Sequence, residues 1–149
     1  MEIRRHLPGA VMTVGAVVTV WGSFQPWLAS GSAQRSSYQL LGLVDRLGYA
    51  ASGPMGWAVS SWPVMPLLVV TATVAIWWGR VRTAALLGAV GALHAAAVSV
   101  GIRRAPGDGL VRTLSGASIT LAGSAVILVG VAASLALARR PTPARAADA

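Results

Sequence analysis

The sequence predicts an all-α membrane protein: a four-transmembrane-helix bundle with a short amphipathic helix in its first outer loop. Four apolar stretches are each about 18–23 residues long, the length that a helix needs to cross a hydrocarbon core about 30 Å thick. They cover 7–28, 62–79, 83–101 and 116–138. Only 11% of the 149 residues are charged, whereas a soluble domain carries about 25%. The spans use more than half of the chain, so residues 1–138 are expected to form one bundle domain.

The first span follows a basic N-terminal segment that contains Arg4 and Arg5. The same pattern opens a secretory signal peptide, and the small residues at 31–33 resemble a cleavage site. However, the apolar run to Leu28 is longer than the usual signal-peptide core of about 7–15 residues. We therefore favour a membrane span over a cleaved signal peptide.

A short helix is expected between the first two spans. Ser36 and Gln39 have the spacing of a capping box, with Ser36 as N-cap and Gln39 at the third helical position. Apolar residues follow at helical spacing as far as Leu47, and Gly48 is a typical helix stop. The predicted helix from Ser36 to Leu47 is too short to span the membrane. It is expected to lie on the outer membrane surface or to cap the mouth of the bundle.

The later spans carry start and packing signals. Pro63 and Pro66 suit the first turns of the second span, where missing amide donors cost little. Close backbone approach through small residues drives helix association in lipid. Small residues four or seven apart are Ala84, Gly88, Ala92, Ala96, Gly91, Ala95 and Ser99 in span three, and Gly116, Thr120, Ser124, Gly123 and Gly130 in span four. We expect these rows to pack spans three and four together; a homo-oligomer or partner interface is the alternative.

The arginines orient the bundle, because cytoplasmic loops carry an excess of Lys and Arg. Seven arginines fall on one side: Arg4, Arg5, Arg80, Arg82, Arg139, Arg140 and Arg145. Five fall on the other: Arg35, Arg46, Arg103, Arg104 and Arg112. We therefore expect a multi-pass protein of the cell membrane with both termini in the cytoplasm. The segment 139–149, which contains two prolines, is expected to be a disordered cytoplasmic tail.

Composition excludes several functional classes. The chain has no cysteine, which excludes disulfides, zinc–thiolate sites and iron–sulfur clusters. All 12 basic residues are arginine, a usage typical of a GC-rich bacterial genome. These arginines lie at span ends and not in a stripe interleaved with aromatics, so the net charge of +8 indicates membrane anchoring and no nucleic-acid partner. No cofactor and no metal site is predicted.

The most distinctive local sequence follows the first span, where aromatic and polar residues alternate. One interpretation is a binding pocket at the outer mouth, formed by Trp27, Arg35, Tyr38, Asp45 and Arg46. Arginine suits phosphate because its planar fork binds two oxygens at once, so the expected ligand is a lipid phosphate or a partner loop. The alternative is that the arginines only anchor the protein at lipid headgroups and the tryptophans form an aromatic belt.

His94 lies near the middle of the third span. An ionisable residue inside a membrane is a functional hypothesis by default, and the candidate roles are heme ligation, proton relay and substrate contact. The alternative is a neutral histidine that hydrogen-bonds to hydroxyls of neighbouring spans. The candidate hydroxyls belong to Thr13, Thr19, Thr71, Thr73, Thr120 and Ser124. All four acidic residues, Glu2, Asp45, Asp108 and Asp148, lie outside the spans, so we favour the structural role.

The region 21–48 also resembles a known group of proteins. It contains Pro26-Trp27, Ser30-Gly31 and Arg35-Ser36-Ser37-Tyr38, a pattern similar to that of uncharacterised small four-span membrane proteins of actinobacteria. This resemblance implies a four-span membrane fold and no particular activity. The topology, with a long first outer loop that starts near a Trp-Gly pair, also resembles that of claudin-type tetraspan proteins, although the cysteine pair of that group is absent here.

Together these features predict a non-catalytic integral membrane protein, an accessory or scaffold subunit of a larger membrane assembly. The alternative is a small lipid-binding or transport protein that acts as an oligomer. An enzyme would need a nucleophile with a base, paired carboxylates or a metal site, and the chain offers only Asp45 and Asp108 on separate outer loops. The expected partners are membrane lipids and either a membrane protein or further copies of this chain.

Overall fold

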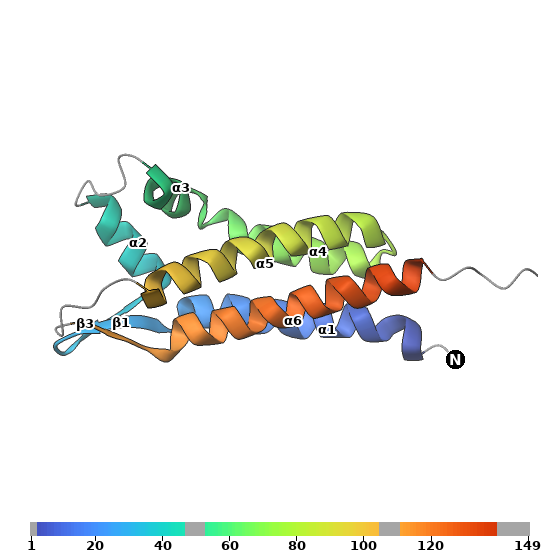
Figure 1. The fold of residues 1–149 in the computed structure, drawn as a ribbon, viewed down its shortest axis with the longest axis horizontal. Helices are drawn as coiled ribbons and strands as arrows, with labels where there is room; N and C mark the ends of the chain where they lie inside the picture. Colours follow the sequence, from blue (N-terminus) through green and yellow to red (C-terminus); the bar gives the residue numbers. More distant parts are fainter. Residues whose placement is uncertain (1–2, 47–52, 105–110, 140–149) are drawn as a thin grey trace, which may run out of the picture.

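The computed structural model describes residues 3–46, 53–104 and 111–139. The elements follow in the order α1 (Ile3–Phe24), β1 (Pro26–Ser30), β2 (Ala33–Ser36), α2 (Ser37–Arg46), α3 (Gly53–Ser61), α4 (Val64–Trp77), α5 (Val81–Arg104), β3 (Val111–Thr113) and α6 (Ser115–Ala138). Helices α1, α4, α5 and α6 run along the long axis, and the sheet, α2 and α3 gather at one end (Figure 1). The all-α architecture is therefore confirmed for the described residues, with a small sheet added. Expected features at Glu2, 47–48, Asp108 and 140–149 lie outside these residues.

Three of the described helices are long and apolar enough to cross a membrane: His6–Phe24, Val81–Arg104 and Ser115–Ala138. The predicted spans 83–101 and 116–138 fall inside α5 and α6. The predicted second span corresponds to α4, which has 14 residues. At 1.5 Å per residue α4 is roughly 21 Å long, shorter than a hydrocarbon core of about 30 Å.

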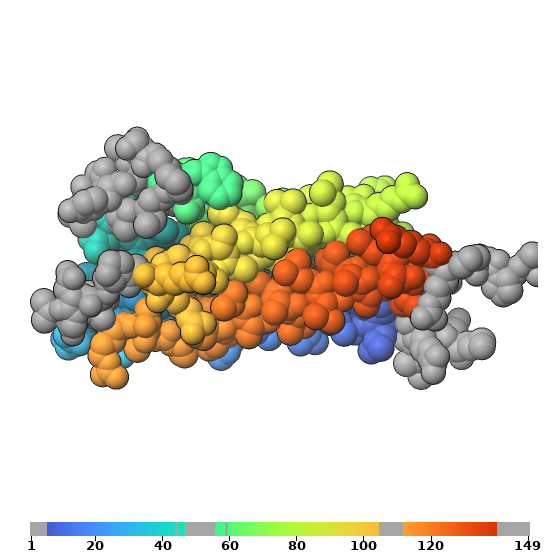
Figure 2. Space-filling view, viewed as in Figure 1, coloured from blue at the N-terminus to red at the C-terminus, as the bar shows by residue number. Residues whose placement is uncertain are grey.

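Large apolar side chains cover the outside of the long helices. Those more than half exposed include Val14, Val17, Trp21, Leu67, Leu86, Leu93 and Val129. Helices α5 and α6 lie side by side along one long face of the molecule (Figure 2). Large apolar side chains exposed in this number mark contact with a membrane or another protein. Together with the three helices of spanning length, they support insertion in a membrane.

The first span ends earlier than the sequence predicted. Helix α1 stops at Phe24 and Pro26–Ser30 forms β1, so the expected helix to Leu28 is wrong over its last residues. Proline has no amide donor and disfavours helical geometry in the residue before it. The chain turns back at Gly31, where φ is 59°, and β2 pairs antiparallel with β1. Strand β3 pairs with the other edge of β1, giving the sheet order β2-β1-β3.

The predicted amphipathic helix is confirmed as α2, which starts one residue later than expected. The backbone N–H of Ser36 donates a hydrogen bond to Oε1 of Gln39 at 3.1 Å. This is one of the two reciprocal bonds of a capping box, and it fixes the point where strand β2 gives way to the helix.

The approach to the second span is a helix that the sequence analysis missed. Helix α3 lies across the direction of α4 (Figure 1), and α4 begins after Pro63, its N-cap residue. At the other end of α4, Gly79 N–H donates to Ile76 O at 3.1 Å and Arg80 N–H donates to Ala75 O at 2.9 Å. These two bonds form a Schellman motif. Gly79 adopts a φ of 75°, which side chains with a Cβ rarely tolerate.

Glycines set the close contact between α1 and α6, which run antiparallel. A Cβ on Gly123 would lie 2.5 Å from the backbone N of Thr19, and a Cβ on Gly15 would lie 2.7 Å from the backbone N of Ile127. The two backbones approach this closely only because neither glycine has a side chain. The expected packing against span three is therefore wrong for Gly123 and Gly130, which both face α1.

Helix α5 packs between α4 and α6. A Cβ on Gly88 would lie 3.3 Å from a side-chain methyl of Val131 in α6, which confirms a contact of spans three and four at this level. A Cβ on Gly91 would lie 2.8 Å from a side-chain methyl of Val69 in α4. The small residues of span three thus serve two neighbours, because they occupy two sides of one helix.

The two ends of the long axis differ. The turn end holds the start of α1, the α4–α5 turn and the last residues of α6 (Figure 1). The opposite end holds α2 and the three strands, which together we call the platform, with α3 beside it. The predicted binding residues of the first outer loop all belong to the platform.

Candidate outer-face binding site

A groove on the platform collects most of the predicted outer-face residues. Its volume is about 450 Å³, within the range of about 300–1,000 Å³ that is usual for small-ligand sites. Strand β2 and helix α2 supply its lining: Ala33, Gln34, Arg35, Tyr38, Gln39, Gly42, Leu43 and Arg46. We call this hollow the arginine groove, because it brings Arg35 and Arg46 to one place.

Helical periodicity explains why these residues share a face. Tyr38, Gly42 and Arg46 are successive i, i+4 neighbours on α2 and therefore lie one above another. A Cβ on Gly42 would meet nothing within 4 Å, so the missing side chain leaves space between Tyr38 and Arg46. Arg35 enters the same hollow from β2.

The charges in the groove are of one sign. Arg35 and Arg46 are exposed and both line the hollow, whereas no acidic residue is among its lining residues. Asp45 is exposed on α2 but does not line the groove. The arrangement offers two guanidinium forks, with Gln34 and Gln39 as further hydrogen-bonding groups, to an anionic ligand.

Trp27 does not belong to this surface. Its side chain is 1% exposed, and its Nε1–H donates to the carbonyl of Gly22 at 2.9 Å. Its ring lies edge-on to Trp62 at 5.4 Å between centroids. The prediction of Trp27 as an outer-face binding or belt residue is therefore wrong. It is a core residue on the buried side of the platform, because β1, the strand that follows α1, turns it inward.

Ser37 ties the platform to the bundle, and the sequence analysis missed this role. Its side chain is fully buried, and its Oγ–H donates to the carbonyl of Ser23 in α1 at 2.5 Å. The same Oγ accepts a hydrogen bond from Nε1–H of Trp62 at 3.1 Å. One hydroxyl thus joins α1, α2 and the turn between α3 and α4. The only sequence signal was its place at the start of an amphipathic helix.

Tyr38 links the groove to the core. Its ring stacks on Phe24 with a centroid distance of 4.9 Å, and it lies edge-on to Trp62 at 6.5 Å. The half-buried ring therefore has one side against the aromatic core while it also lines the groove. This packing restricts the position of Tyr38 and orders the wall of the groove.

His94 lies away from the groove, on the side of α5 that faces α3. Its Nε2 is 3.4 Å from Oγ of Ser61, and its ring lies 4.9 Å from that of Trp57 and 5.8 Å from that of Trp62. Ser61 is not among the six hydroxyl partners that the sequence suggested, because those predictions placed His94 at mid-span and did not include α3. The contacts of His94 are those of a residue that packs α3 against α5.

The part of the chain that the structure describes contains no cluster of metal-ligating side chains. Within 3–46, 53–104 and 111–139, no three His, Cys, Asp or Glu side chains gather in a group that could hold a metal ion.

Comparison with known proteins adds no further assignment: a scan against protein-family models, a search of curated proteins and a search of solved structures each find no match. The likeness to actinobacterial four-span proteins thus stays a prediction.

Proposed function

We propose that this protein is a non-catalytic integral membrane protein, an accessory or scaffold subunit of a larger assembly in the bacterial cell membrane. In this proposal α1, α4, α5 and α6 form four spans, both termini lie in the cytoplasm, and the platform faces outward. The contact with the partner is the arginine groove. The observation that carries the proposal is that the platform is anchored to the bundle through Ser37 and presents a groove whose charged lining residues, Arg35 and Arg46, are both positive.

The arrangement of the long helices supports the four-span topology. Four lengthwise helices that alternate in direction bring the chain back to the end where it began. The start of α1 and the end of α6 accordingly both lie at the turn end (Figure 1). Helix α4 is short, so in this topology it crosses the membrane core together with the turns at its two ends, and α3 lies across it at the platform end. Arg80 and Arg82 lie at the turn end, which suits the cytoplasmic side.

Charge supports an acidic partner surface. Five described arginines lie at the platform end and are exposed: Arg35, Arg46, Arg103, Arg104 and Arg112. The described acidic residue at that end is Asp45. Such a surface attracts a carboxylate-bearing loop, and the planar forks of Arg35 and Arg46 bind carboxylates in bidentate geometry. We therefore infer that the partner is a membrane protein with an acidic outer segment.

The anchoring of the platform supports recognition by a preformed surface. The Ser37 hydroxyl holds α2 against α1, and Tyr38 lies edge-on to the buried ring of Trp62. A rigid binding site loses less conformational entropy when a partner docks. A groove that is already formed therefore favours a stable subunit contact.

The test is gentle detergent extraction of a tagged chain from its native host, followed by native mass spectrometry. The parent chain should copurify with a stoichiometric partner, and the Arg35→Gln/Arg46→Gln variant should lose most of it. The matched control is Arg103→Gln/Arg104→Gln, which removes the same charge at the same end outside the groove and should keep the partner. A parent chain that emerges without a partner would overturn the accessory function. Equal copurification by the two double variants would remove the groove from the contact.

A further inference from the structure

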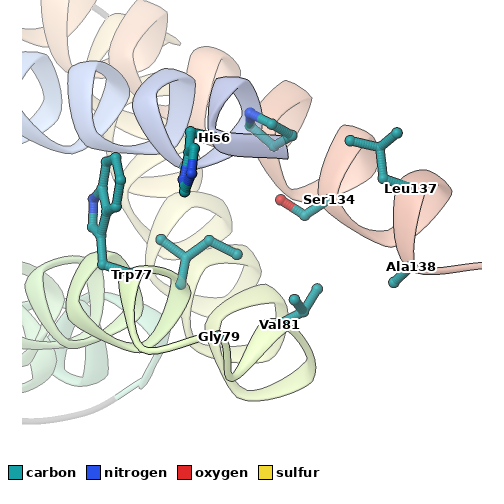
Figure 3. Close-up of a pocket in the computed structure, with 10 residues that line it drawn as sticks. His6, Trp77, Gly79, Val81, Ser134, Leu137 and Ala138 are labelled. Carbon is teal, nitrogen blue, oxygen red and sulfur yellow. The ribbon is translucent and has the colours of Figure 1, made fainter. Parts of the chain in front are cut away.

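The bundle has a second hollow at the turn end, where the four long helices part. Its volume is about 460 Å³. It is lined by His6, Pro8 and Gly9 of α1, Ile76 and Trp77 of α4, Gly79, Val81 of α5, and Ser134, Leu137 and Ala138 of α6. Figure 3 shows these side chains converging on a common space from three sides. We call it the turn-end cavity.

The walls of the turn-end cavity are mostly apolar. Among the lining residues only His6, Trp77 and Ser134 carry polar side-chain atoms. The Ser134 hydroxyl already donates to the carbonyl of Gly130 at 2.7 Å, and Nε1–H of Trp77 donates to Thr13 Oγ1 at 3.1 Å. Two of these three polar groups are thus engaged within the protein. The space therefore suits a hydrocarbon chain better than a polar solute.

Arginine borders the cavity on each chain segment that forms it. Arg80 lies between the lining residues Gly79 and Val81, and Arg139 follows the lining residue Ala138. Arg5 precedes the lining residue His6 in α1. The described residues at the turn end include no Asp or Glu. Basic pockets between transmembrane helices on the cytoplasmic side bind anionic lipid headgroups.

An aromatic pair stands at the same place. The rings of His6 and Trp77 stack at 6.0 Å with an interplanar angle of 13°, and Trp77 is 53% exposed. Tryptophan prefers the level of the lipid headgroups. The cavity thus has apolar walls that suit an acyl chain and an aromatic pair of the kind found at the membrane interface. Arginines lie next to its lining residues in the sequence.

We propose that the turn-end cavity holds one acyl chain of an anionic glycerophospholipid, whose phosphate is bound by Arg80 and Arg139. This inference goes beyond the proposed accessory function: it rests on the proposed membrane topology but not on the partner contact. Its site lies at the opposite end from the arginine groove, and its ligand comes from the bilayer. The failure of the partner contact therefore leaves this inference standing, and the reverse also holds.

A cavity-filling variant tests the acyl-chain part. Gly9 lines the cavity, and the three atoms nearest to a Cβ placed there are side-chain atoms of Ile76 and Trp77 at 3.8 Å, so Gly9→Leu adds side-chain volume at this wall. Gly101→Leu is the matched control, because nothing lies within 4 Å of its Cβ position and it lines neither hollow. Ala138→Phe, which approaches the cavity from α6, provides a second filling variant if Gly9→Leu fails to fold.

The measurement is native mass spectrometry of each purified protein after equilibration with an equimolar mixture of phosphatidylglycerol and phosphatidylcholine. The parent and Gly101→Leu should retain one phosphatidylglycerol under activation that strips the other lipids, and the filling variants should retain none. Arg80→Gln/Arg139→Gln should lower the ratio of retained phosphatidylglycerol to phosphatidylcholine by about tenfold, whereas Arg103→Gln/Arg104→Gln should not. Equal retention of the two lipids by the parent, or full retention by both filling variants, would overturn the inference.

Discussion

The indole N–H of Trp62 donates a hydrogen bond to Oγ of Ser37 over 3.1 Å, and both side chains are fully buried. The two residues are 25 positions apart and belong to different parts of the chain. Because Ser37 in turn donates to Ser23, the pair holds the first residue of α2 between α1 and the start of α4. The position of the arginine groove depends on this contact, since α2 forms one wall of it.

Ser37→Ala should destabilise the protein by about 1–3 kcal/mol, because it leaves the buried N–H of Trp62 without its acceptor. Ser32→Ala, in the exposed hairpin turn, is the control and should change stability by less than about 0.5 kcal/mol. Thermal unfolding of the two variants in the same detergent measures the difference. Identical unfolding temperatures would show that the Ser37 bond contributes nothing to the anchoring of the platform.

Gly123→Ala should destabilise the bundle by about 1–3 kcal/mol through overpacking. The new Cβ would meet backbone atoms of Thr19, which cannot rotate away as a flexible side chain could. Gly101→Ala makes the same chemical change in α5 where nothing lies within 4 Å, and it should be neutral or slightly stabilising because alanine favours helix. Thermal unfolding in detergent distinguishes the two. A Gly123→Ala protein as stable as Gly101→Ala would contradict the close α1–α6 contact.

The absence of native cysteine makes the proposed topology directly measurable. A cysteine at Gln34 of the platform should react with a membrane-impermeant maleimide in intact cells. A cysteine at Arg82, at the turn end, should react only after the membrane is permeabilised. The unmodified chain provides a background without reactive thiols. Labelling of both positions in intact cells would show that α4 and α5 do not form a pair of spans.

His94→Phe should keep the protein folded and its partner bound. The phenylalanine ring preserves packing between Trp57 and Trp62, and the variant loses only the 3.4 Å contact with Ser61. His94→Ala removes the ring and should be less stable than His94→Phe by about 1 kcal/mol, the worth of an aromatic contact. Unfolding temperature and copurified partner are measured for both. Loss of the partner at unchanged stability in His94→Phe would show a functional role instead.

Some helix ends could be predicted from one or two residues, and others could not. The helix stop at Gly79 and the proline-led start of α4 follow from backbone preferences, and the structure places both within about two residues of the expected positions, the usual uncertainty of helix ends. The end of α1 was missed, although Pro26 signalled it, because the apolar run continues through β1 and hydrophobicity alone does not distinguish a helix from a short strand.

The candidate site was predictable only at the level of its exposed residues. Arg35, Tyr38 and Arg46 come together as expected, because helical spacing and a short hairpin keep them close in sequence and in space. Trp27 and Ser37 were not predictable. Their burial depends on which distant residues, above all Trp62, pack on them.

By itself, the sequence determined that this chain is apolar, helical and free of cysteine chemistry; of the four stretches that it predicted to span, three are helices of spanning length in the described residues. Those properties depend on composition and local periodicity, which every segment carries within itself. Only the tertiary structure decided that Gly123 meets α1, that Ser37 anchors the platform and that a cavity opens at the turn end. A small residue permits a close approach from any neighbour, and a cavity exists only where several helices part. The choice of neighbour therefore belongs to the packed bundle as a whole.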